Sequence, residues 1–236
     1  MHKHELPREL RARIEKRRGR AHAFDPIDPA KTALLVVDMQ NYFCEPGQAC
    51  EIPLAREIVP NINCLARACR GSGATVVWIL MTQSPETMKS WTVFYDHLNT
   101  PEYGANEARR LAEGDHGNAL WHAMEPAPGD LTVRKKRFSA FIQGSSELDA
   151  VLRGRGIDTL LVTGTTTNTC CLTTALDAMM LDYKVVFVSD GTAAMGEAQH
   201  LASLANVLNV FGDVRSTDDA VGLLRAGAGK GRAAAE

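Results

Sequence analysis

The sequence of residues 159–171 is TLLVTGTTTNTCC, an apolar run that ends at Gly164 and continues through small polar residues to two cysteines. A short, continuous apolar run predicts a strand that is buried on both faces. The glycine and threonines that follow predict a tight turn into a helix, which extends to about Asp182. The stretch is therefore a strand–turn–helix unit with a thiol at its turn, and it favours an α/β fold.

The same alternation extends on both sides of this unit. Other helices are predicted at 7–20, 55–70, 145–155, 197–209 and 216–224. Other strands are predicted at 33–38, 74–80, 131–134, 184–189 and 210–214. Alternating strands and helices predict an α/β fold with a three-layer, doubly wound, mostly parallel six-stranded sheet. We expect a helical extension at 1–30, one domain at 31–226 and a flexible tail at 227–236.

Composition excludes several classes of protein. The 236 residues carry a net charge of −2, which gives no electrostatic reason to expect nucleic acid or a membrane as partner. No apolar run approaches the roughly 20 residues that span a bilayer, and the basic N-terminus lacks the apolar core of a secretory signal. We therefore expect a cytoplasmic protein. Its six cysteines have neither a disulfide-framework pattern nor zinc-finger spacing.

Two segments stand outside the pattern. Residues 7–20 hold seven Arg and Lys side chains diluted by glutamates, which favours a helix packed on the domain or on a partner subunit over a nucleic-acid contact. Residues 84–130 form a long connection rich in aromatic side chains. Such a connection is either a lid over a binding site or an irregular segment with its own small apolar core.

In parallel sheets the ligand site lies beyond the carboxyl ends of the strands. This rule selects Asp38, Lys135 and the turn 164–171, but it selects Thr82 and Asp190 equally. In the turn, a cysteine in the first helical turn has its thiol pKa lowered by unpaired N–H groups and the helix dipole. Cys171 falls on the apolar stripe of that helix, so Cys170 is the candidate exposed thiol; the alternative is that both are inert.

Asp38 and Lys135 each have two interpretations. Asp38 either caps the following turn or accepts a proton from a thiol and later activates water. Lys135 belongs to the charged run 134–137, whose members are usually solvated. A buried Lys135 would keep a neighbouring carboxylate ionised.

Three segments together resemble the isochorismatase-like cysteine hydrolase family. They are 36–43 (VVDMQNYF), 135–141 (KKRFSAF) and 163–170 (TGTTTNTC), and the resemblance extends from about Ala33 to Leu224. It implies a catalytic triad of Asp38, Lys135 and Cys170, a cis peptide at Thr165–Thr166, and an oxyanion hole made by the backbone N–H groups of Thr166 and Cys170. The expected substrate-binding side chains are Gln40, Phe43, Trp91, Phe138 and Asn168.

The resemblance also implies the reaction. We expect a cysteine amidohydrolase that cleaves a C–N bond of a small amide or ureido compound through a thioester, closest in pattern to ureidoacrylate-type amidohydrolases. The alternatives are a vinyl-ether hydrolase that does not need the cysteine, and a non-catalytic or redox-sensing homologue. Residues 80–88 lack the Asp and His cluster that holds a metal in nicotinamidases, so we expect no metal and no cofactor. A homodimer or homotetramer is expected because family members usually associate.

Overall fold

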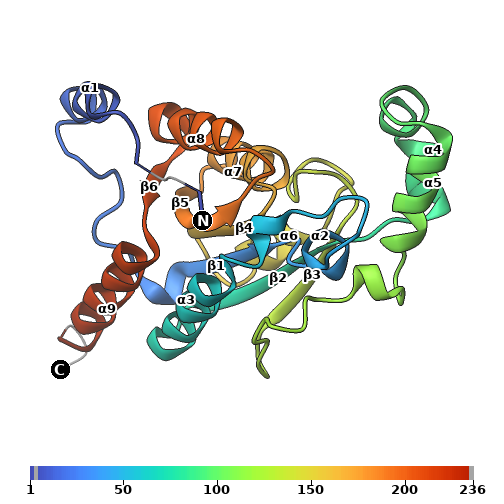
Figure 1. Cartoon of the computed structure of the whole chain (residues 1–236). Helices are drawn as coiled ribbons and strands as arrows, with labels where there is room; N and C mark the ends of the chain where they lie inside the picture. The colour runs from blue at the N-terminus through green and yellow to red at the C-terminus, as the bar shows by residue number, and fades with distance from the viewer. Residues whose placement is uncertain (3–4, 234–236) are drawn as a thin grey trace.

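The computed structural model describes residues 1–2 and 5–233, and its centre is one parallel sheet (Figure 1). The strand order is β3-β2-β1-β4-β5-β6. The strands are β1 (Thr32–Val37), β2 (Thr75–Met81), β3 (Leu131–Lys135), β4 (Thr159–Thr165), β5 (Lys184–Ala193) and β6 (Asp213–Arg215). The prediction of a six-stranded α/β sheet is confirmed, and the pairing is parallel throughout.

The central strand β1 shows how the layers form. All six of its residues are buried. Ala33, Leu35 and Val37 face one apolar cluster, whereas Leu34 and Val36 face the other, as the two-residue period of a strand requires. Helices α3 (Val59–Ser72) and α9 (Thr217–Ala233) cover the second face. Helices α6 (Leu148–Arg153), α7 (Leu172–Met180) and α8 (Glu197–Asn206) cover the first. The sheet is therefore the middle of three layers.

Several predicted boundaries differ from the structure. Strand β6 begins at Asp213, because residues 207–211 continue α8 as a π-helical turn, η6 (Val207–Phe211). Helix α9 continues to Ala233, past the predicted start of a flexible tail at residue 227. Gly227 lies so close to the backbone carbonyl of Ile27 that an added Cβ would be 2.3 Å from it. Residues 234–236 lie outside the described residues. No helix among those described is long and apolar enough to cross a membrane.

The N-terminal helix packs on its own domain. Helix α1 (Arg8–Arg18) buries Ile14 against the first apolar cluster. The Arg18 guanidinium donates hydrogen bonds to the carbonyl groups of Leu208 (2.7 Å) and Gly212 (2.8 Å). These carbonyls end the π-helical turn η6, where a cation is favoured. Arg18 thus makes a structural contact between α1 and the rest of the chain.

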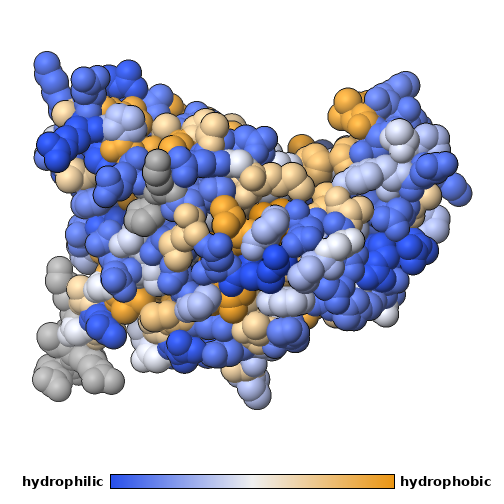
Figure 2. Space-filling view, in the orientation of Figure 1, coloured by the Kyte–Doolittle hydropathy of each residue, from blue (hydrophilic) through white to orange (hydrophobic). Residues whose placement is uncertain are grey.

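The connection at 84–130 contains a lobe, which we define as residues 84–118. It holds α4 (Pro85–Ser90), the π-helical turn η3 (Val93–His97), α5 (Pro101–Arg110) and the 3-10 turn η4 (His116–Asn118). In Figure 1, α4 and α5 stand apart from the helices that cover the sheet. Figure 2 shows a hollow in the outline between the lobe and the body, edged by apolar side chains. The remaining short elements are η1 (Pro29–Lys31), α2 (Asn41–Cys44), η2 (Pro53–Ala55) and η5 (Thr167–Cys171).

Candidate active site

The sheet order brings three predicted residues together at its carboxyl edge. Asp38 follows β1, Lys135 ends β3, and Cys170 lies in the π-helical turn η5 after β4. The Lys135 ammonium (Nζ) is 2.8 Å from Asp38 Oδ2 and 3.3 Å from Cys170 Sγ. The cationic group therefore contacts both the carboxylate and the thiol.

Lys135 differs from its charged neighbours because of strand geometry. On β3, Val133 and Lys135 face inward whereas Arg134 faces out, where it pairs with Glu113. The Lys135 side chain is fully buried, and its ammonium also donates to the carbonyl of Arg137 at 3.1 Å. Burial alone would lower the pKa of Lys135, but Asp38 and Cys170 outweigh it and raise that pKa. Lys135 is therefore a permanent internal cation.

Asp38 is held from both ends of its backbone. Its N–H donates to the carbonyl of Ile79 at 2.9 Å, and its carbonyl accepts from Thr165 Oγ1 at 3.0 Å. Its φ of 51° lies in the left-handed region, which aspartate tolerates better than most residues. Burial raises the pKa of the Asp38 carboxyl, and Lys135 opposes that rise. The result is a basic, buried carboxylate beside an ammonium and a thiol.

The structure corrects two expectations for Cys170. The thiol is 5% exposed, so it is not a surface thiol. Burial raises the pKa of Cys170, and the effect of Lys135 in the opposite direction is smaller. The prediction of a lowered pKa was wrong because desolvation of the thiolate has the largest effect. Cys170 is therefore neutral at rest and needs a base. Cys171 is fully buried in the core, as its position in the apolar stripe predicted.

The turn before Cys170 depends on the close approach of β4 to β1. Gly164 has a φ of +106°, and an added Cβ would be 2.0 Å from the carbonyl oxygen of Val37. The Thr165–Thr166 peptide bond is cis. The Thr167 hydroxyl and His200 Nδ1 are joined by a 3.0 Å hydrogen bond, which ties the turn to α8. The nucleophile turn is therefore fixed by neighbours on two elements.

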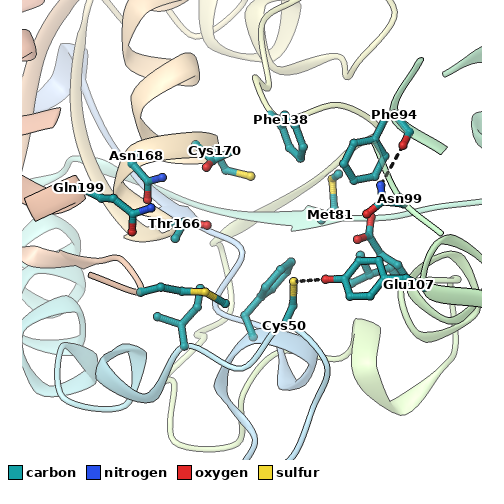
Figure 3. Close-up of a pocket in the computed structure, with 16 residues that line it drawn as sticks. Cys50, Met81, Phe94, Asn99, Glu107, Phe138, Thr166, Asn168, Cys170 and Gln199 are labelled. Atoms are coloured by element: carbon teal, nitrogen blue, oxygen red, sulfur yellow. Dashed lines mark hydrogen bonds between the residues drawn. The ribbon is translucent and has the colours of Figure 1, made fainter. Parts of the chain in front are cut away.

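A cavity of about 260 Å³ opens above Cys170, between the body and the lobe (Figure 3). The cavity is lined by three of the side chains predicted to bind substrate, Phe43, Phe138 and Asn168, together with Thr166 and Cys170. The Asn168 Oδ1 atom is buried and has no hydrogen-bond partner within the described part of the chain. An orphaned amide oxygen at a cavity wall is available to an N–H group of a ligand.

The structure places the other two predicted binding residues away from this cavity. Gln40 is fully buried, and its amide bonds the backbone N–H (2.8 Å) and carbonyl (3.0 Å) of Met81 and the carbonyl of Asn118 (2.8 Å). It therefore joins the end of β2 to the end of the lobe at Asn118. Trp91 packs its ring 4.8 Å from Phe138 and borders a separate hollow. It supports a wall residue instead of forming the wall.

Sequence reasoning offered the connection 84–130 as a possible lid but did not identify the lobe residues that line the cavity. Phe94, Asn99, Tyr103, Glu107 and Leu111 line it, and Cys50 joins them from the body. Glu107 could have been found, because α5 buries Gly104, Glu107 and Ala108 at helical spacing. A carboxyl on the buried stripe of an amphipathic helix is unusual enough to mark a site.

Across residues 1–2 and 5–233, no group of three or more His, Cys, Asp or Glu side chains is arranged to hold a metal ion.

Comparisons with known proteins agree on one family. The isochorismatase domain model matches residues 32–219. Ureidoacrylate amidohydrolase RutB from Methylobacterium radiotolerans is 33% identical over 216 residues, which cover 84% of this chain and 82% of that protein. A cysteine hydrolase from Pseudomonas syringae pv. phaseolicola has a TM-score of 0.74 at 29% identity, with 87% of this chain and 98% of that chain covered. N-carbamoylsarcosine amidase from Thermoplasma acidophilum has a TM-score of 0.63 at 27% identity, with 80% and 97% covered.

Proposed function

The chain belongs to the isochorismatase family of hydrolases, and on this premise we propose that it is a cysteine amidohydrolase. It cleaves a C–N bond of a small amide or ureido compound through a thioester intermediate. Cys170 is the nucleophile, Asp38 the base and Lys135 the cation that orients and charges Asp38. The amidase names of two similar proteins support this choice of bond.

The observation that carries the proposal is the double contact of Lys135. Its ammonium lies 2.8 Å from Asp38 Oδ2 and 3.3 Å from Cys170 Sγ. A neutral, buried thiol is a weak nucleophile until a base removes its proton. Asp38 and Cys170 interact directly, and burial raises the pKa of both groups. Asp38 is therefore placed to take the proton while Lys135 stabilises the thiolate.

The first half of the reaction forms the thioester. Asp38 accepts the Cys170 proton, and Sγ attacks the substrate carbonyl carbon to give a tetrahedral oxyanion. The N–H groups of Thr166 and Cys170 stabilise that oxyanion. The C–N bond then breaks, and the proton held by Asp38 passes to the nitrogen, which leaves as ammonia or an amine. Cys170 remains bonded to the acyl group.

The second half releases the acid. Asp38 is again ionised, and it takes a proton from a water molecule that attacks the thioester carbonyl. The same N–H groups stabilise the second oxyanion. The C–S bond breaks, and the thiolate takes back the proton from Asp38. The product that leaves is a carboxylic acid from an amide or a carbamic acid from a ureido compound. Lys135 stays protonated throughout, so the site is regenerated without a cofactor.

The test is ammonia release from a panel of small amides and ureido compounds, with wild-type protein and a Cys170→Ala variant. We expect the variant to lose at least about a thousandfold of the wild-type rate. Cys171→Ala is the matched control, because it removes the adjacent core thiol and keeps the nucleophile. Circular dichroism and urea unfolding establish that both variants fold.

Two outcomes would contradict the proposal. One is undiminished amide hydrolysis by Cys170→Ala. The other is a wild-type protein inactive on amides that hydrolyses a vinyl ether at the same rate with and without Cys170, which would assign the alternative reaction.

A further inference from the structure

A second buried carboxyl lines the cavity from the lobe. Glu107 lies on α5 in the lobe and is 6% exposed. Figure 3 shows it on the lobe side with Asn99, whereas Asn168 and Thr166 lie on the body side and Cys170 lies between them. The Glu107 carboxyl has no hydrogen bond or ion pair with any described residue. A carboxyl in this position is aimed at whatever occupies the cavity.

The groups around Glu107 leave it without a counter-charge. Tyr42, Cys50, Tyr95 and Tyr103 interact with it electrostatically, and all four are neutral groups whose pKa burial raises. The nearest cation that acts on it is Lys135, which is already paired with Asp38. No Lys, Arg or His side chain is among the described residues that line the cavity. The Glu107 carboxyl therefore has no basic side chain to balance its charge among these lining residues.

The charge of a ligand decides how it interacts with the Glu107 carboxyl. A cation or a group with several N–H donors can pair with the ionised Glu107 and compensate its desolvation. A carboxylate in the same place would put two like charges together in a poorly solvated cavity, which is costly unless a proton is taken up. An ionised Glu107 would therefore favour cationic over anionic ligand groups, at the lobe side of the cavity.

We propose that Glu107 is a specificity-determining residue that selects amides carrying an ammonium, a guanidinium or a cluster of N–H donors at the end remote from the scissile bond, over amides carrying a carboxylate there. This inference rests on the proposed function, since it assigns the substrate class of the same site. It separates this chain from the similar protein whose name, ureidoacrylate amidohydrolase, denotes a carboxylate substrate.

The protonation of Glu107 sharpens the inference. Burial raises the pKa of Glu107 to about 7, against the smaller opposing effect of Lys135. Above that pH the carboxyl is ionised and the preference for cations is full. Below it the carboxyl is neutral, and the preference shrinks. Burial raises the pKa of the three surrounding phenols and of the Cys50 thiol, so these groups stay neutral across this range.

The experiment measures how charge affects entry to Cys170, without needing the substrate. Wild-type protein is treated at pH 8.5 with three methanethiosulfonates of similar size, carrying a 2-aminoethyl (positive), an ethyl (neutral) or a 2-sulfonatoethyl (negative) group. Peptide mass spectrometry follows modification of Cys170 separately from Cys50, and each rate is divided by the rate of the same reagent with a free thiol. We expect the positive reagent to exceed the negative one by on the order of tenfold or more.

Glu107→Gln, which keeps the shape, should reduce that ratio to near one. Glu102→Gln, which removes an exposed carboxyl of the same helix, should leave it unchanged. Wild-type protein at pH 5.5 gives a second readout that needs no variant, and there the ratio should also fall. A ratio that is the same in wild type and Glu107→Gln, or the same at both pH values, overturns the inference.

The two proposals fail in different ways. A Cys170 that reacts with none of the reagents, while Cys50 or Cys64 does, contradicts the proposed nucleophile and the inference that depends on it. A Cys170 that reacts with all three at equal normalised rates leaves the amidohydrolase proposal standing and overturns the role of Glu107 alone. Amide pairs differing in an ammonium or a carboxylate end then repeat the comparison with turnover, where Glu107→Gln should change KM more than kcat.

Discussion

The two sides of the cavity each bury one carboxyl, and they treat it in opposite ways. On the body side, Asp38 contacts the Lys135 ammonium at 2.8 Å and both side chains are fully buried. On the lobe side, Glu107 is 6% exposed and has no paired cation among the described residues. The body side comes from strand ends of the sheet, whereas the lobe side comes from a helix inserted between β2 and β3.

The difference teaches what a counter-ion does for a buried acid. A paired carboxylate is favoured in its charged form by the neighbouring cation, which suits the proton transfers proposed for Asp38. An unpaired carboxyl has a charge that depends on pH and on the ligand, so it can serve selection. The proposals thus give the two sides of one cavity different roles. The body side carries out the reaction, and the lobe side recognises the ligand through a carboxyl whose charge varies.

The largest effect is expected when the ion pair on the body side is broken. In Lys135→Met the Asp38 carboxyl stays buried without its cation, which should cost roughly 3–5 kcal/mol of unfolding free energy. Amide hydrolysis should fall by at least about a thousandfold, because Asp38 takes up a proton and no longer acts as a base. Urea unfolding and ammonia release measure the two effects.

A double variant separates charge from packing in the same test. Asp38→Asn combined with Lys135→Met removes both charges and should recover much of the lost stability, while activity stays absent. If the double variant were as unstable as Lys135→Met alone, the loss would come from packing, and the contrast between paired and unpaired acids would not hold.

A smaller effect distinguishes the backbones of the two sides. Gly164 in the body has a φ of +106° and would bring an added Cβ 2.0 Å from a backbone oxygen of Val37. Gly104 in the lobe would bring one 3.0 Å from the ring of Tyr95, a side chain and not backbone. Gly164→Ala should cost about 3 kcal/mol or more, whereas Gly104→Ala should stay within about 1 kcal/mol, since helix propensity offsets the contact. If thermal unfolding showed the same loss of stability in both variants, the contrast between a rigid body and an adaptable lobe would not hold.

The same contrast explains how much of the candidate site could be predicted from the sequence. Parallel strands end at one edge, so topology brings Asp38, Lys135 and the turn that holds Cys170 together. That rule selected other residues equally, and the family resemblance was needed to single out these three. The predicted exposure and lowered pKa of Cys170 failed because they used the helix end and ignored burial, which depends on what the lobe and the body place above the thiol.

The lobe could not be built from the sequence in the same way. Its short helices have no sheet register to position them, so the aromatic residues at 84–130 indicated a cover without saying which face each presents. Trp91 and Gln40 were therefore predicted to touch substrate, whereas one supports Phe138 and the other fastens Met81 and Asn118. Glu107 was missed although its place on the buried stripe of α5 was readable.

The smallest effect is a pH dependence that belongs to Glu107. Burial raises its folded-state pKa to about 7 from an ordinary value of 4.5. Between these values the folded protein holds a proton that the unfolded chain has released, so this contribution to stability is full below about pH 4.5 and is lost as pH rises through 7. The Glu107→Gln variant has no carboxyl at this position, so it does not lose this stability as pH rises. Relative to wild type, its unfolding free energy should therefore rise by about 1–3 kcal/mol between pH 5 and pH 8 in urea titrations. A difference that did not change with pH would mean that Glu107 is ionised throughout and paired as securely as Asp38, and the two sides of the cavity would then be alike.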